Sequence, residues 1–98
     1  MVNNNIEEAV FSLIEKYNAP SIFSFRRFKL QHNTDLNNDF RMDPLDAYDL
    51  LEKFTIEFNI NPLEINFEYY FPDFGDPEAP LTIQLLIDSA KAGHWLGK

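Results

Sequence analysis

The side chains that could carry out catalysis are few in this chain. Among its 98 residues are two histidines, His32 and His94, and no cysteine. The Gly-x-Ser-x-Gly turn that presents a serine nucleophile is absent. Hydrolysis needs a nucleophile, a base and a group that orients the base, and these residues cannot assemble such a set. We therefore predict no catalytic residues and no enzymatic activity.

Two short clusters have only part of the pattern of a ligand site. An acidic loop contains Asp73, Asp76 and Glu78, but it lacks the spacing of a calcium-binding loop, and Pro77 restricts its backbone. Residues 25–29 (FRRFK) interleave aromatic rings with three cations, as nucleic-acid-binding surfaces do. Three cations are a weak signal in an acidic chain. We predict no metal site and no nucleic acid partner.

The candidate functional residues are acids that recur at every third position of one segment. They are Asp43, Asp46, Asp49 and Glu52. The whole chain carries 16 acidic and 8 basic residues, for a formal net charge of −8. Such a surface repels nucleic acid and anionic lipid and attracts basic proteins. It can equally serve only to keep a small protein in solution.

A helix predicted over residues 44–58 must position these acids. Asp43 is a typical N-cap, and Pro44 fits the first helical position because its missing N–H has no partner there. Apolar residues recur at helical spacing and form one buried face: Ala47, Leu50, Leu51, Phe54 and Phe58. The acids then wind around the exposed side, where Tyr48 is a candidate aromatic anchor for a partner.

In the N-terminal part, residues 5–17 are predicted to form a helix. Ile, Val, Leu and Tyr recur there at helical spacing. Asn5 can cap this helix, and Glu7 and Glu8 would lie in its first turn, where the helix dipole favours them. Residues 21–30 (SIFSFRRFKL) are predicted to be a short strand or an extended loop, since their aromatic residues alternate and then change phase. Residues 32–40 (HNTDLNNDF) are rich in turn formers and are predicted to be a loop.

Between the helix at 44–58 and the last helix, the pattern is mixed. Residues 61–64 (NPLE) can start a single helical turn. Residues 65–71 alternate apolar and polar side chains, which is typical of a strand. Residues 72–80 contain three prolines and a glycine and are predicted to be a loop.

The last helix is predicted over residues 82–92. Thr82 is its N-cap, and Gly93 ends it in the left-handed conformation that glycine adopts without strain. The segment after it (HWLGK) is expected to fold back, with Trp95 against the core.

Length and composition predict one domain, residues 1–98. Hydrophobic residues make up 45% of the chain, and ten residues are phenylalanine, so the core material is adequate. Without cysteine there are no disulfides or thiolate metal sites. The first residues, MVNNNIEEAV, have neither a basic region nor a long apolar run, so we predict no signal peptide, no membrane association and a cytoplasmic location.

Residues 43–58 resemble the second helix of acyl carrier proteins, which are small acidic four-helix domains. In that family a D-S-L motif opens this helix, its serine carries phosphopantetheine, and the acidic helix docks onto basic enzyme surfaces. Here Asp43-Pro44-Leu45 takes the place of D-S-L, and the helix continues in register. The resemblance implies that Pro44 occupies the phosphopantetheine-serine position. Proline has no hydroxyl, so we expect no covalent arm at this position and no cofactor.

The resemblance extends loosely over nearly the whole chain. Asp35-Leu36 is similar to a D-L-G motif upstream of D-S-L, with Asn37 in place of the glycine and a spacing four residues longer. Thr82-Ile83 is similar to the threonine-capped start of the fourth helix. Residues 69–72 (YYFP) and 81–95 (LTIQLLIDSAKAGHW) are more similar to a bacterial family of unknown function that is described as acyl-carrier-like.

This resemblance implies a mainly α fold, an acyl-carrier-like bundle of three to four helices. An enlarged loop or a short two-stranded β ribbon would lie between the helix at 44–58 and the last helix, and a small α+β fold is the alternative. The leading functional hypothesis is a non-enzymatic interaction module that docks a basic protein through Asp43, Asp46, Tyr48, Asp49 and Glu52. The alternatives are a noncovalent binder of an acyl or apolar ligand, and an acidic inhibitor or antitoxin of a basic protein. The sequence does not determine the oligomeric state.

Overall fold

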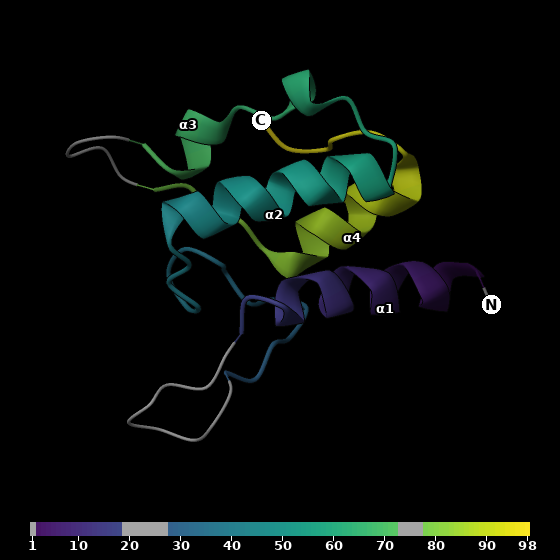
Figure 1. Ribbon diagram of the computed structural model, residues 1–98, viewed down its shortest axis with the longest axis horizontal. Helices are drawn as coiled ribbons and strands as arrows, with labels where there is room; N and C mark the ends of the chain where they lie inside the picture. The colour runs from purple at the N-terminus through teal and green to yellow at the C-terminus, as the bar shows by residue number, and fades with distance from the viewer. Residues whose placement is uncertain (1, 19–27, 73–77) are drawn as a thin grey trace.

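Three helices carry most of the fold in a computed structural model that describes residues 2–18, 28–72 and 78–98. They are α1 (Val2–Glu15), α2 (Pro44–Glu57) and α4 (Ile83–Ala92). Between α2 and α4 the chain forms the 3₁₀ turn η1 (Pro62–Glu64) and the short helix α3 (Phe67–Tyr70). α1 packs against both α2 and α4, while η1 and α3 lie along the far side of α2 (Figure 1). The predicted mainly α fold is confirmed. No strand occurs in the described ranges, so the β ribbon and the α+β alternative are wrong there.

Helix α2 begins as predicted. Asp43 is its N-cap in an extended conformation, its carboxylate accepts a hydrogen bond from the Leu45 N–H at 2.8 Å, and Pro44 occupies the first position. The predicted apolar face is buried in the core, with Ala47, Leu50 and Phe54 fully covered. Phe58 is only partly buried, because it lies just beyond the end of the helix.

Helix α2 ends where Asn59 adopts the left-handed conformation, with φ 56°. The Ile60 N–H donates to the Thr55 carbonyl at 2.9 Å, which is the closing hydrogen bond of a Schellman motif. Asparagine tolerates this conformation better than most residues. Ile60 follows this turn and is buried. From there the chain runs back along α2 (Figure 1).

Helix α1 begins earlier than predicted. It starts at Val2, so Asn5 is not its cap, and its first turn contains no acidic residue. The reason is that residues 2–4 include neither glycine nor proline, so nothing stops the helical backbone from continuing past Asn5. Glu7 and Glu8 therefore lie in the middle of the helix.

A loop before α2 is tied to the start of α4. The Leu36 N–H donates to the Leu81 carbonyl at 2.8 Å, and Asp35 pairs with Thr82 in an isolated β-bridge. Carbonyls of the same loop accept from the first N–H groups of α4, which otherwise have no partner inside the helix. Thr82 caps α4 as predicted, accepting from the Leu85 N–H at 3.1 Å, and Gly93 ends it with φ 80°.

The strand prediction for residues 65–71 is wrong. The segment contains the α3 turn, in which the rings of Phe67 and Phe71 stack with centroids 5.1 Å apart. These two residues are four apart, so their spacing satisfies a helical period as well as a strand period. The single turn predicted at 61–64 is confirmed as η1, capped by the Asn61 side chain.

Trp95 packs against the core, as predicted. It is 5% exposed, and its ring contacts Phe54 of α2 and Tyr70 of α3 at centroid distances of 6.2 and 5.9 Å. The tail after α4 therefore closes one end of the core.

Residues 19–27 and 73–77 lie outside the described residues, together with the predictions made for most of FRRFK and for the middle of the loop at 72–80. Within the described ranges, no helix combines the length and apolarity needed to cross a bilayer.

Candidate functional site on helix α2

All five predicted partner-binding residues lie on α2 or at its cap, but their environments differ. Asp43 is engaged in capping through its bond to the Leu45 N–H. Its carboxylate therefore serves first to start the helix. Pro44 beside it is exposed at the first helical position.

Asp49 is the acid of this set whose partners are other side chains. Its Oδ2 accepts a hydrogen bond from the Tyr17 hydroxyl at 2.5 Å and lies 3.1 Å from Nζ of Lys53. The Lys53 ammonium also lies 5.8 Å from the centre of the Tyr17 ring. Asp49 thus joins α2 to the chain just after α1, and less of its charge is available to a partner than the sequence pattern implied.

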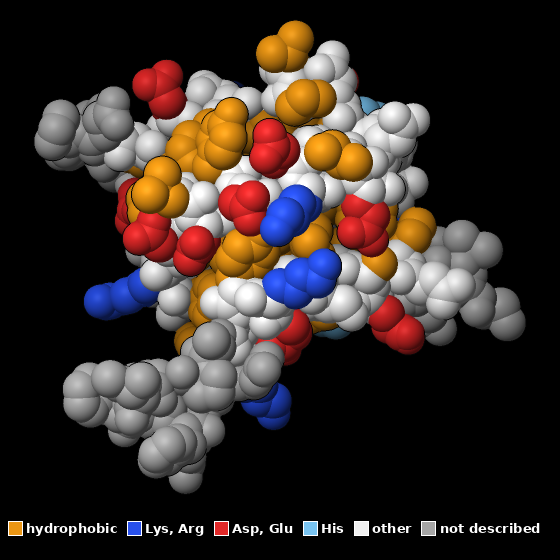
Figure 2. Space-filling view, in the orientation of Figure 1, with side chains coloured by type: hydrophobic (Ala, Val, Ile, Leu, Met, Phe, Trp, Pro, Cys, Tyr) orange, Lys and Arg blue, Asp and Glu red, His pale blue; other side chains and the backbone are white. Residues whose placement is uncertain are grey.

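Asp46 and Glu52 are exposed, and neither side chain has a hydrogen bond or ion pair within the described residues. Large apolar side chains are exposed on the same helix: Leu45 is 81% and Ile56 76% accessible. Figure 2 shows apolar side chains gathered around α2, η1 and α3, with acidic side chains among them. α2 therefore presents both free carboxylates and apolar surface to solvent.

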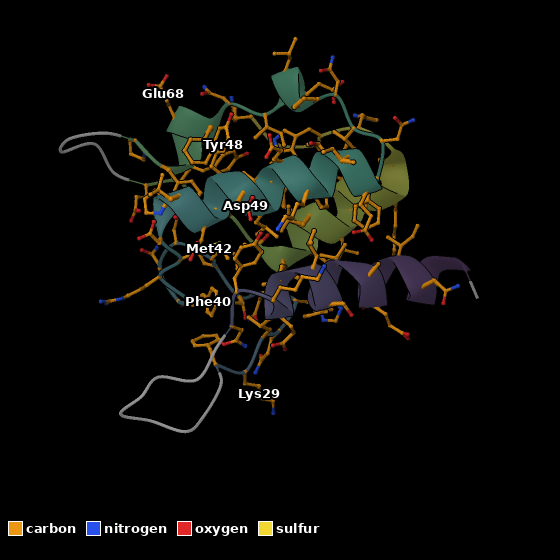
Figure 3. The ribbon with its side chains drawn as sticks, in the orientation of Figure 1. Lys29, Phe40, Met42, Tyr48, Asp49 and Glu68 are labelled. Atoms are coloured by element: carbon orange, nitrogen blue, oxygen red, sulfur yellow. The ribbon has the colours of Figure 1, made fainter. Side chains whose placement is uncertain are left out.

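A groove of about 310 Å³ lies between α2 and the segment from η1 to the start of α3, which runs along it (Figure 1). Its lining comprises Tyr48, Leu51, Glu52, Thr55, Pro62, Leu63, Ile65 and Phe67. The α2 members follow i, i+3, i+4 and i+7 spacing and so share one face. In Figure 3, Tyr48 projects from α2 toward α3, and its ring meets Phe67 edge-on at 5.4 Å. Glu52 is the one ionisable acid in this lining.

Three contacts from the C-terminal tail brace the outer wall of the groove. The Trp95 N–H donates to the Glu64 carboxylate at 2.9 Å, and the Asn66 N–H donates to the Lys98 main-chain oxygen at 2.9 Å. The Lys98 N–H donates to the Tyr70 hydroxyl at 2.8 Å. These contacts hold η1 and α3 beside α2, so the outer wall of the groove is fixed by contacts within the chain.

Comparison with models of protein families shows the family of this chain. Residues 3–98 match the family described as "Protein of unknown function (DUF1493)". The chain belongs to the DUF1493 family. No curated protein and no solved structure matches it. The predicted membership of a family of unknown function is thus confirmed at this level, whereas the comparisons show no link between this DUF1493 chain and acyl carrier proteins.

Neither histidine of the DUF1493 chain lines the α2 groove. His32 pairs with Glu7 of α1, and Lys91 of α4 lies 3.7 Å from the same carboxylate. The hydrogen bond from His32 lowers the pKa of Glu7. His94 contacts the carbonyl of its neighbour Trp95. Within the described ranges, no cluster of three or more potential metal ligands occurs.

Sequence reasoning found the acids of the DUF1493 chain but missed the groove beside them. The turn at 61–64 was a usable signal, because a capped turn soon after a helix can bring the chain back along it. The alternation at 65–71, however, predicted a strand and not a wall of this groove. Leu63, Ile65 and Phe67 lie beside α2 because the C-terminal tail holds their segment there. Such contacts between distant segments leave no pattern in the local sequence.

Asp49 should make the stability of this DUF1493 protein depend on acid pH. The Tyr17 hydrogen bond, followed by Lys53, lowers the pKa of Asp49 from its ordinary value of 3.8. Since the folded pKa lies below the unfolded one, this stabilisation is present above pH 3.8 and is lost as the pH falls through the folded value. We expect Asp49→Asn to lose less stability than the wild type between about pH 5 and pH 2 in urea unfolding.

The matched control is Asp46→Asn, which removes a carboxylate from the same helix that has no partner among the described residues. Its acid dependence should follow the wild type more closely than that of Asp49→Asn. Equal slopes for wild type and Asp49→Asn would show that the Tyr17 contact contributes nothing to stability.

Proposed function

We propose that this protein is a non-enzymatic, acyl-carrier-like interaction module that docks a basic protein through α2. The observation that carries the proposal is the exposed α2 surface, where Asp46 and Glu52 have no partner among the described residues and Tyr48 is 59% accessible. Carboxylates with exposed apolar and aromatic side chains between them are suited to a partner that offers cations around an apolar centre.

The net charge of −8 also supports a basic protein as the partner. It raises the rate of encounter with basic proteins and disfavours nucleic acid and anionic membranes. Within the proposal, Pro44 occupies the position at which an acyl carrier protein would bear its arm. It keeps the start of α2 well formed while offering no nucleophile. Docking would therefore proceed without a covalent cargo at this position.

The proposal is tested by reversing the two free acids together, Asp46→Lys with Glu52→Lys. Extract from the source cells is passed over the wild-type and variant proteins, and captured proteins are quantified by mass spectrometry. Basic proteins that the wild type captures specifically should be retained about tenfold less by the variant.

The control is Glu8→Lys with Asp88→Lys, which changes the net charge equally on α1 and α4. It should retain the captured proteins. If the double reversal on α2 keeps every specific partner, or if the control loses them equally, α2 is not the docking surface.

A further inference from the structure

The groove beside α2 is a second recognition element, with Glu52 in its wall. Its walls are apolar or aromatic except at Glu52 and Thr55, and Thr55 turns its hydroxyl to the Glu52 carbonyl at 2.9 Å. One rim residue, Leu63, is 90% exposed, which leaves a large aliphatic side chain in water. One exposed aliphatic side chain is ordinary by itself, but its position on the rim of a mostly apolar recess suits it to contact a bound group.

We infer that this groove receives one bulky apolar side chain of the basic partner, flanked in the partner's chain by lysine or arginine. The inference rests on the proposed function and specifies what the partner must carry. The anchor would lie between the Tyr48 ring and Leu63, and its neighbouring cation would pair with the Glu52 carboxylate.

The size of the groove favours a single side chain. Its volume of about 310 Å³ lies at the lower limit of the pockets that hold drug-sized ligands. Anchor residues at protein interfaces are mostly tryptophan, tyrosine or arginine that insert into such recesses. The rings of Tyr48 and Phe67, already in edge contact at 5.4 Å, can meet a third ring edge-on or offset-stacked.

The charge around the groove selects between occupants. The Glu52 carboxylate lies in its wall, so the potential at the groove is negative. A fatty acid would bring its own carboxylate next to Glu52 and be repelled. A cation beside an apolar anchor is attracted, and this complementarity favours a basic protein segment over an acyl ligand.

The groove is also formed in advance. Contacts of Glu64 with Trp95 and of Asn66 with Lys98 hold its outer wall, so little ordering is required when a partner binds. Preformed sites lose less conformational entropy on binding, which raises affinity for a small anchor.

The test uses two short helical peptides made of lysine and alanine that differ only at one central residue, tryptophan or alanine. Binding to the full-length protein is measured by titration with amide NMR spectra. The tryptophan peptide should bind about tenfold more tightly than the alanine peptide. The largest shifts should fall on residues 48–55 and 62–67.

Two variants separate the groove from the surrounding surface. Leu63→Ser removes a rim side chain that is almost fully exposed and so should leave the fold intact; it should abolish the preference for tryptophan. Ile56→Ser removes another largely exposed apolar side chain, one of α2 that does not line the groove, and it should keep that preference.

Several results would contradict the groove inference. Equal affinity for the two peptides, or equal loss in Leu63→Ser and Ile56→Ser, would overturn the groove inference and leave charge-based docking by α2 standing. Failure of both peptides to bind would also overturn it, as would binding of decanoate in the groove without binding of peptide. Failure of the proposed function is recognised separately, by the extract experiment with the α2 charge reversal.

Discussion

Replacing Phe54 by alanine should lower the free energy of unfolding by about 3–5 kcal/mol, the largest effect we expect from a single substitution. Phe54 is fully buried, and its ring contacts Phe58 at 5.1 Å and Trp95 at 6.2 Å. Alanine removes the transfer energy of the ring and leaves a cavity that the helices around it can fill only in part. A domain of this length has roughly 5–15 kcal/mol of stability in total, so the loss is a large share of it.

Thermal and urea unfolding followed by fluorescence measure this effect. Trp95 is the single tryptophan of the chain and packs on Phe54, so its emission should shift to longer wavelength as the cavity loosens its surroundings. Ile56→Ala is the control on the same helix, because Ile56 is 76% exposed and its truncation should change stability by under about 0.5 kcal/mol. A Phe54→Ala loss no larger than that of the control would mean that this end of the core is not closely packed.

Replacing Asn37 by glycine should destabilise the protein by about 2–4 kcal/mol. The Asn37 amide donates to the Tyr70 carbonyl at 2.7 Å and to the Ala79 carbonyl at 2.8 Å, in a largely buried setting. Glycine would leave both carbonyls without this donor and add backbone freedom to the unfolded chain. Asn37 is absent from the residues with positive φ, so glycine would bring no conformational gain.

Asn38→Gly is the matched control, since it makes the same substitution at the exposed neighbouring residue. It should cost under about 1 kcal/mol in urea unfolding. If the two glycine variants unfold at the same urea concentration, Asn37 does not hold the loop against α3. If they differ as expected, asparagine at position 37 is a structural requirement of this chain, because its side chain joins the loop before α2 to the end of α3 and to Ala79.

Caps and periodicity predicted α2 and α4 closely, and the reason is that these signals are local. Asp43, Thr82 and Gly93 act on N–H and carbonyl groups within a few residues of themselves, so their effect can be read along the chain. The same reasoning failed at Asn5, where a capping residue lies inside a helix that nothing interrupts. It failed again at Phe67 and Phe71, whose spacing fits two kinds of structure.

The acids of α2 show the same limit at the candidate site. Their recurrence at every third residue is visible in the sequence, but the partners of each acid are not. Asp49 meets Tyr17 across 32 positions of the chain, and this contact sets it apart from Asp46 and Glu52. The groove likewise needs Trp95 and Lys98 to hold the segment after η1 against α2.

By itself, then, the sequence determined an acidic, mainly helical chain with a well-capped α2 that bears carboxylates and, at Pro44, no nucleophile. The tertiary structure alone decided which of these carboxylates lack a partner among the described residues, and that a braced apolar groove lies beside Glu52. The physical reason is the distance along the chain between the residues that interact. Helix ends depend on neighbours within one or two turns, whereas free charges and grooves depend on contacts between segments that meet only after folding.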